Sequence, residues 1–240
     1  PPWRTTSNHG VRPMERGQRL TDALVAYTGS LFAREDALLR DLNAEIERRG
    51  LPHIQIGPQQ GRALQLLLRA IGARRVLEIG TLGGYSAIWM ARALPPDGRL
   101  VTLELAEERA ALAREFIRRA GLADRVEVAV GPAADTLRRL LEEGGECAWD
   151  ACFIDADKDS YPAYLRWARR LVRVGGLILA DNAYRAGAVL HPPQGGEAAA
   201  IDQFNRKLAR DRGLLSTILP LGDGLAVALV TGPPGRRAED

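Results

Sequence analysis

The sequence predicts an α/β fold built on a Rossmann-like, doubly wound, mainly parallel sheet of seven strands. Short runs rich in Val, Ile and Leu alternate with amphipathic helical segments from residue 73 onward. This alternation is typical of right-handed β–α–β units. The last two apolar runs, 214–220 and 225–230, are separated only by the turn LGDG. So short a connection predicts an antiparallel hairpin at the C-terminal end.

The segment before the sheet predicts extra N-terminal helices. Residues 1–16 are polar and patternless, so we expect a disordered tail or a cloning remnant, with Met14 as a candidate natural start. The helical pattern covers residues 18–50 and returns at 61–71 after a linker. We therefore expect one domain over residues 17–240, with N-terminal helices at 17–72 and the Rossmann-like core at 73–232.

Within the core, each predicted strand is followed by a predicted helix. The strands are expected at 74–79, 99–104, 125–130, 149–154 and 175–181, and the helices at 84–94, 105–121, 133–144, 161–172 and 197–211. Folds of this class bind ligands beyond the carboxyl ends of their parallel strands. The residues in those positions are Gly80–Ser86, Glu104, 131–133, Asp155–Lys158 and the pair Asp181-Asn182.

Composition narrows the class of protein. The chain has 240 residues, of which 46% are hydrophobic and 26% charged, as in ordinary globular proteins. No apolar run approaches the roughly 18 residues of a membrane span, and no secretory signal is apparent. Cys147 and Cys152 form neither a disulfide framework nor a zinc spacing. We expect cytoplasmic residence and no membrane partner.

The basic residues do not indicate a nucleic-acid partner. The net charge is +3 and the pI is near 9.2, but basic residues are mixed with Glu and Asp along the helices. No basic stripe is interleaved with aromatic residues. Binding to nucleic acid is therefore the less favoured interpretation.

The turn after the first strand, EIGTLGGYS, argues for one kind of nucleotide-like ligand. A dinucleotide fingerprint would need glycine at positions 82 and 85, where the chain has Leu82 and Tyr85, and no P-loop pattern occurs. The spacing E-x-G-x-x-x-G, from Glu78 to Gly84, resembles motif I of class I S-adenosylmethionine-dependent methyltransferases. In that family an acid at the position of Glu104 accepts hydrogen bonds from the ribose hydroxyls. A plain tight turn with a surface glutamate is the alternative.

Two neighbouring strands end in oxygen-bearing side chains. Asp155 ends one strand, and Asp181 and Asn182 end the next. Neighbouring strands lie about 4.8 Å apart, so these side chains could converge. Two carboxylates and an amide oxygen suit Mg, Ca or Mn. Aspartates also commonly cap helices, and the spacing alone leaves both interpretations open.

Lys158 lies in the same charged stretch, FIDADKDSY. Of 33 basic residues only Lys158 and Lys207 are lysine. Arginine stays protonated in proteins, whereas lysine can act as a base when its pKa is lowered. The scarcity of lysine thus favours a chemical role for Lys158, although chance survival at a surface position remains open.

Together these stretches resemble the cation-dependent O-methyltransferases of the caffeoyl-CoA and catechol type. The resemblance covers residues 20–230 and rests on IGPQQGRAL, GTLGGYSA, GPAADTL, FIDADKDSY, VGGLILADN and LPLGDGLAVA. It implies transfer of the methyl group of S-adenosylmethionine to a hydroxyl of a catechol-like, vicinal dihydroxy aromatic. It also implies a divalent cation, usually Mg, and a homodimer.

Carried over position by position, the resemblance assigns roles to single residues. Asp155, Asp181 and Asn182 become the metal ligands, and Lys158 the general base. The implied S-adenosylmethionine contacts are Ile56, Glu78, Gly80, Thr81, Gly84, Tyr85, Ser86, Glu104, Ala133 and Asp155.

The chain departs from the family after the Asp-Asn pair. The family often has Leu-Trp there, whereas this chain has Tyr184 and Arg185, which we expect to line the acceptor pocket. His191 is expected to be a solvated loop residue, and His53 has no metal-ligand spacing. Two rival functions remain: an RNA methyltransferase, which would be insensitive to EDTA, and a non-catalytic S-adenosylmethionine-binding protein, which would bind without turnover.

Overall fold

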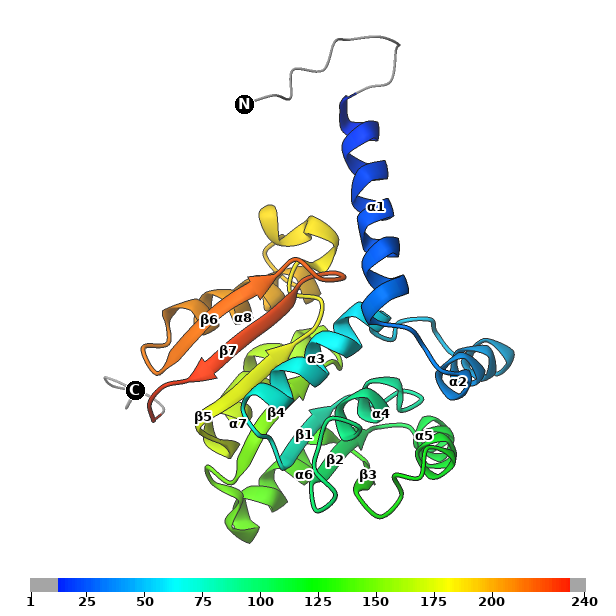
Figure 1. Cartoon of the computed structure of the whole chain (residues 1–240). Helices are drawn as coiled ribbons and strands as arrows, with labels where there is room; N and C mark the ends of the chain where they lie inside the picture. The colour runs from blue at the N-terminus through cyan, green and yellow to red at the C-terminus, as the bar shows by residue number, and fades with distance from the viewer. Residues whose placement is uncertain (1–12, 234–240) are drawn as a thin grey trace.

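The central element is a seven-stranded sheet (Figure 1). The computed structural model describes residues 13–233, with side chains described from residue 23. Across the sheet the order is β3 (Val126–Val130), β2 (Arg99–Glu104), β1 (Arg75–Ile79), β4 (Trp149–Ile154), β5 (Val172–Ala180), β7 (Leu225–Val230) and β6 (Leu214–Leu219). Strands β1 to β5 pair in parallel, and β7 is antiparallel to both β5 and β6. The predicted mainly parallel sheet and its C-terminal hairpin are confirmed.

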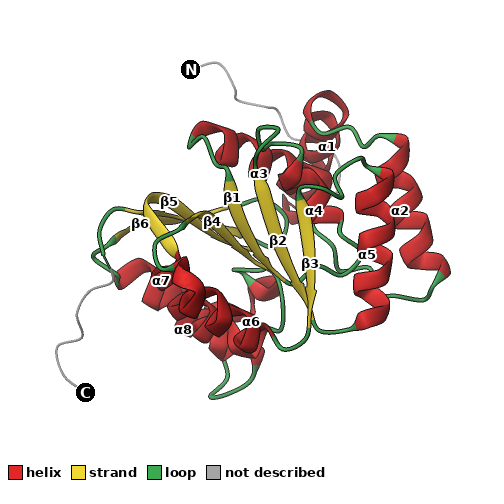
Figure 2. Ribbon diagram, turned by 90° about the horizontal axis from the view of Figure 1, so that it is seen from below, coloured by secondary structure: helices red, strands yellow, loops and turns green. Residues whose placement is uncertain are grey.

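Helices cover both faces of the sheet (Figure 2). One face carries α3 (Pro58–Ala70), α4 (Tyr85–Ala91) and α5 (Glu107–Arg119), and the other carries α6 (Ala133–Leu140), α7 (Tyr161–Leu171) and α8 (Glu197–Arg210). Successive strand residues point to opposite faces, so Val76 joins one hydrophobic core and Leu77 the other. Burying each such side chain stabilises the fold by about 1.5–3 kcal/mol. This is why the strands read as continuous apolar runs.

The N-terminal part contains two helices where the sequence predicted one stretch over 18–50. They are α1 (Pro13–Phe32) and α2 (Ala37–Arg48). The break is set by Asp36, whose carboxylate accepts a hydrogen bond from the Leu39 N–H at 3.0 Å and so caps α2. Helix α1 begins inside the predicted tail, since proline suits a first helical turn, where its missing N–H is not needed. Residues 1–12 lie outside the described part.

These helices differ in how they contact the core. Helix α2 packs near α5, where Arg119 donates to Asp41 at 2.7 Å. Helix α1 instead extends away from the sheet (Figure 1). Within residues 13–233, no helix combines the length and the apolarity that a membrane crossing needs.

Gly80 lets the β1 loop approach the end of β4. Its φ of 97° lies in the left-handed region that favours glycine. A Cβ at this position would overlap the carbonyl oxygen of Asp155. The glycine therefore brings the turn after β1 against the charged end of β4, where the site forms.

Candidate active site

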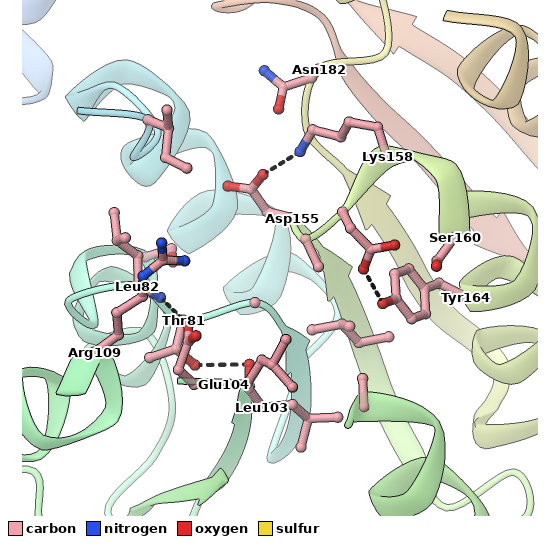
Figure 3. A pocket seen from close by; sticks show the side chains of 18 of the residues that line it. Thr81, Leu82, Leu103, Glu104, Arg109, Asp155, Lys158, Ser160, Tyr164 and Asn182 are labelled. Atoms are coloured by element: carbon pink, nitrogen blue, oxygen red, sulfur yellow. Dashed lines mark hydrogen bonds and ion pairs between the residues drawn. The ribbon is translucent and has the colours of Figure 1, made fainter. Parts of the chain in front are cut away.

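A cavity of about 840 Å³ lies beyond the carboxyl ends of the parallel strands (Figure 3). Its walls come from the loops after β1, β2, β3, β4 and β5, together with residues 54–55 ahead of α3. One end is formed by Thr81, Leu82, Glu104 and Arg109, and the other end by Asp155, Lys158 and Asn182. We call these the glutamate end and the charged end.

At the glutamate end, Glu104 is held by two backbone N–H groups. Its carboxylate accepts hydrogen bonds from Leu82 at 2.9 Å and from Ala106 at 3.0 Å. The side chain is only 6% exposed, yet it lines the cavity. Thr81 holds the same turn in place by donating to the Leu103 carbonyl at 3.2 Å. The carboxylate is thus fixed where the chain leaves β2.

Glu78 lies behind this wall. It is fully buried, and its carboxyl oxygens accept hydrogen bonds from Ser86 and, at 2.5 Å, from Thr102. Burial raises the pKa of Glu78 to about 8, although the two hydroxyl donors oppose the rise. Because Ser86 lines the cavity and Glu78 does not, Glu78 supports the wall through Ser86.

The structure brings most of the predicted cofactor contacts to the cavity wall. Those that line it are Gly80, Thr81, Tyr85, Ser86, Glu104, Ala133 and Asp155. Ile56 is instead packed in the hydrophobic core, and its neighbours Ile54 and Gln55 line the cavity. Gly84 is a left-handed turn residue, with φ 88°, packed against Ala113.

At the charged end, Lys158 is held by two partners. Its Nζ donates to Asp155 Oδ1 at 2.9 Å and to the Tyr161 hydroxyl at 2.9 Å. Tyr161 is fully buried, and its hydroxyl oxygen lies 3.3 Å from the carbonyl oxygen of Ile154 and 3.2 Å from that of Asp181. The tyrosine thereby joins the ends of β4 and β5 to the lysine. Burial raises the pKa of Asp155, although the Lys158 ammonium opposes the rise.

Strand register brings Asp181 beside Asp155. Ile154 pairs with Ala180, and the Asp181 N–H donates to the Ile154 carbonyl at 3.1 Å. Burial and repulsion from Asp155 raise the pKa of Asp181 to about 6. Asp181 is only 3% exposed and does not itself line the cavity, but it lies beside Asp155. When both carboxyl groups are ionised, they carry one more negative charge than the Lys158 ammonium balances.

Asn182 completes the oxygen set. Its φ of 56° is left-handed, a conformation that asparagine tolerates better than most residues, and its side chain lines the cavity near Lys158 (Figure 3). Within residues 13–233 no group of three or more His, Cys, Asp or Glu side chains could hold a metal. The candidate set is thus two carboxylates and an amide, a hard set that fits a Mg-type cation with water or acceptor oxygens in the remaining positions.

The alternative role of these aspartates as helix caps has no support in the structure. In the described part, neither Asp155 nor Asp181 accepts a hydrogen bond from a backbone N–H in the first turn of a helix, as a capping side chain would. Their side-chain partners are instead the ammonium of Lys158, for Asp155, and the amide of Gln60, for Asp181.

Of the two residues expected to line the acceptor pocket, the structure places only one at the cavity. Arg185 lines the cavity mouth, where its Nε donates to Glu197 at 3.0 Å. The ring of Tyr184 lies against Gly224, away from the cavity lining. His191 is an exposed loop residue, and the exposed His53 contacts only Gln55 among described residues.

Sequence reasoning missed two buried residues of this end, Gln60 and Tyr161. Gln60 Nε2 donates to Asp181 Oδ1 at 2.5 Å, across 121 residues of sequence. Tyr161 stands at the end of the charged stretch and could have been noticed as a polar group entering a buried helix. Nothing local in the sequence links Gln60 to Asp181.

Comparison with known proteins settles the family. The family described as O-methyltransferase matches residues 30–231. A catechol O-methyltransferase of Mycobacterium tuberculosis is 46% identical over 210 residues, which cover 85% of this chain and 94% of that protein. This chain belongs to the O-methyltransferase family. The resemblance predicted from the sequence motifs is confirmed.

Further relatives of this O-methyltransferase agree in sequence and in structure. A catechol O-methyltransferase of Niastella koreensis is 43% identical over 210 residues, which cover 85% of this chain and 95% of that protein. The crystal structure of an O-methyltransferase from Bacillus cereus in complex with SAH superposes with a TM-score of 0.82 at 40% identity. That match covers 87% of this chain and 97% of that one. The enzyme is therefore a class I, S-adenosylmethionine-dependent O-methyltransferase.

Proposed function

We propose that this O-methyltransferase transfers the methyl group of S-adenosylmethionine to one hydroxyl of a catechol-like small molecule, in a reaction that depends on Mg. The carrying observation is the charged end itself, where Asp155, Lys158 and Asn182 line the cavity. Asp181, which is only 3% exposed, lies at the end of the neighbouring strand, close enough to Asp155 to be repelled by its charge. The relatives named catechol O-methyltransferase support this acceptor class.

We place the cofactor along the glutamate end of the cavity. Glu104, fixed by two backbone donors, is oriented to accept hydrogen bonds from ribose hydroxyls. The turn Gly80–Thr81 and Ala133 allow close approach of the ligand to backbone, and Asp155 stands at the junction with the charged end. This placement points the reactive methyl toward Lys158.

The residues of the charged end fit a Mg-type cation, held by Asp155, Asp181 and Asn182. When bound there, the cation would stabilise a phenolate and orient two vicinal oxygens, as a Lewis acid and a template. A free phenol, with a pKa near 10, is a poor nucleophile at neutral pH. The site's excess of carboxylate charge favours a cation over an anion.

Lys158 is positioned to accept the acceptor's proton. Two of its hydrogen-bonding positions are used by Asp155 and Tyr161, and the side chain lines the cavity, so one position remains for a ligand. To act as a base it must be in the neutral amine form, which a nearby dication favours by repelling the ammonium. The deprotonated oxygen would then attack the sulfonium methyl in line, so that the O–CH3 bond forms as the S–CH3 bond breaks and S-adenosylhomocysteine leaves; fixed orientation supplies much of the rate.

We also propose a homodimer built on the N-terminal helices. On α1, five apolar side chains are each at least half exposed: Leu24, Val25, Tyr27, Leu31 and Phe32. A contiguous apolar surface of this kind commonly marks a protein–protein contact. Light scattering with size exclusion should give twice the chain mass, and Tyr27→Glu should shift it toward the monomer.

The decisive experiment is transfer of a radiolabelled methyl group to a panel of catechols, with and without EDTA. We expect methylation of vicinal dihydroxy compounds only, lost in EDTA and restored by added Mg. Methylation of RNA that persists in EDTA would overturn the proposal in favour of an RNA methyltransferase. Tight cofactor binding without turnover on any catechol would indicate a non-catalytic binding protein.

A further inference from the structure

Gln60 is a buried polar side chain that enters the charged end from outside the sheet. It lies in the first turn of α3 and is only 4% exposed. The other groups of this end come from the strand ends of β4 and β5 and the turns that follow them. Burial of an amide is costly unless its hydrogen bonds are made, so its partners are informative.

The orientation of the Gln60 amide is fixed by both of its partners. Its Oε1 accepts a hydrogen bond from the Gly57 N–H at 3.1 Å, which leaves Nε2 to donate to Asp181 Oδ1 at 2.5 Å. A flipped amide would place donor against donor at Gly57 and acceptor against carboxylate at Asp181. The turn between β6 and β7 packs against the same amide, because a Cβ on Gly222 would lie 2.5 Å from Gln60 Oε1.

The two carboxylates are treated differently by their partners. Lys158 neutralises Asp155 while binding it, whereas Gln60 binds Asp181 without bringing a charge. A neutral donor orients a carboxylate without contributing a charge of its own, so the carboxylate oxygens stay available to a cation. In the described part of the chain, no second side-chain donor contacts the Asp181 carboxylate.

We propose that Gln60 is a positioning residue for the cation site, which holds the Asp181 carboxylate in the orientation that binds a divalent metal. This inference rests on the proposed metal dependence. Groups that hydrogen-bond a metal ligand from behind typically contribute about 10-fold to 100-fold to metal affinity. Helix α3 thereby becomes part of the site, although its side chains donate no metal ligand.

The test is Mn²⁺ binding to the full chain, measured by the loss of the free-ion EPR signal. Gln60→Met keeps the side-chain length but removes both hydrogen bonds, and we expect it to weaken Mn²⁺ binding by about 10-fold to 100-fold. Gln65→Met is the matched control. Gln65 lies on the same helix and donates to the Trp89 carbonyl at 2.9 Å, away from the charged end. It should bind Mn²⁺ like the wild type.

Steady-state kinetics distinguish a role of Gln60 in positioning Asp181 from a general loosening of the fold. For Gln60→Met we expect the Mg concentration at half-maximal rate to rise by about the same factor, with kcat at saturating Mg within about twofold of wild type. S-adenosylmethionine affinity should not change. If Gln60→Met fails to fold, Gln60→Asn serves instead, because it keeps the amide but is too short to reach both partners.

The outcomes distinguish this inference from the proposed function. Wild-type Mn²⁺ affinity in a folded Gln60 variant would overturn the role of Gln60 and leave the metal dependence intact. Equal weakening in the Gln60 and Gln65 variants would also overturn it, since loosening of α3 would then be the cause. A wild-type enzyme that binds no Mn²⁺ and is active in EDTA would overturn both proposals.

Discussion

The two ends of the cavity are built by different means. At the glutamate end, side chains bond to groups close in sequence: Glu78 to Ser86 across 8 residues and Leu82 to Glu104 across 22. At the charged end, Lys158 also bonds locally to Asp155, across 3 residues, but Gln60 reaches Asp181 across 121 residues. The glutamate end is thus a local product of consecutive β–α units, whereas the charged end is complete only once distant segments of the chain have packed together.

The ends also differ in electrostatic balance. Glu104 has its hydrogen bonds satisfied by backbone donors, and Glu78 by hydroxyl groups. Asp155 and Asp181 repel each other in a buried place, and this repulsion, with burial, raises the pKa of Asp181 to about 6. The charged end, with two carboxyl groups that repel each other, therefore gains more from a bound metal cation than the glutamate end does. The predictions below probe this contrast.

The largest expected effect is that of Asp181→Ala. Removing a proposed ligand should abolish activity together with the response to Mg, since outer contacts alone account for about 100-fold at most. Asp159→Ala, which removes an exposed carboxylate from the stretch FIDADKDSY, is the control and should behave as wild type. Methyl transfer with and without EDTA gives the result, and a variant that is fully active in EDTA would contradict the metal proposal.

Next is Lys158→Ala, which removes the proposed base but leaves the glutamate end untouched. Turnover should fall by about 100-fold or more, as losses of general bases do. S-adenosylmethionine binding, measured by calorimetry, should persist. The chain's other lysine provides the matched control: Lys207→Ala, at an exposed position of α8, should keep full turnover. Undiminished turnover in Lys158→Ala would remove its assignment as base.

A smaller effect is expected from Glu104→Gln. Glutamine keeps the shape of the side chain but loses its charge. An amide NH2 group replaces one of the two carboxylate oxygens, so one backbone N–H then faces a donor instead of an acceptor. Cofactor affinity should fall by about 10-fold to 100-fold, as expected for lost hydrogen bonds to a charged group. Mn²⁺ affinity should stay unchanged, because the metal belongs to the other end. Glu107→Gln, at an exposed ion pair with Arg114, is the control. A joint loss of both affinities would show that the two ends are not independent.

The smallest expected effect is a difference in the pH dependence of folding stability between the wild type and Glu78→Gln. Glu78 has a folded-state pKa of about 8, above the ordinary 4.5, so the folded state holds its proton more tightly than the unfolded state. Its contribution to stability is therefore complete below about pH 4.5 and is lost as pH rises through about 8. Relative to Glu78→Gln, which does not titrate, the wild type should lose on the order of 1–3 kcal/mol of unfolding free energy between pH 5 and 8. Denaturant titrations at several pH values measure this, and parallel curves would contradict it.

The contrast between local and long-range contacts also explains which features of the structure the sequence predicted and which it did not. Strand and helix order, the hairpin and the residues of the strand ends follow from local patterns, because the carboxyl ends of parallel strands must share one edge. The sequence prediction missed the break before α2, which is capped by Asp36, and the early start of α1. Both depend on single residues at helix ends within a continuous helical pattern. Gln60 and the position of Ile56 were not predictable, because both are fixed by how α3 packs on the finished sheet.

Glu78 shows that a sequence motif does not specify the direction of a side chain. A motif specifies that a glutamate stands at the end of β1, but not whether its carboxyl faces the cavity or the protein interior. Here Ser86 and Thr102 hold it in the interior. Alternation along a strand gives the face of the sheet, whereas the direction of a long side chain beyond that face depends on which hydroxyls are nearby.

The backbone conformation at Asn182 restricts which residues can replace it during evolution. Its left-handed backbone, φ 56°, admits glycine, asparagine and aspartate at low cost, and disfavours β-branched and bulky side chains. Of the three, glycine offers no side-chain oxygen, and aspartate would add a third carboxylate to a pair that already repels. Asparagine is the one residue that meets both the backbone and the charge requirement. Random substitution at position 182 therefore has few neutral outcomes, even before the chemistry of the reaction is considered.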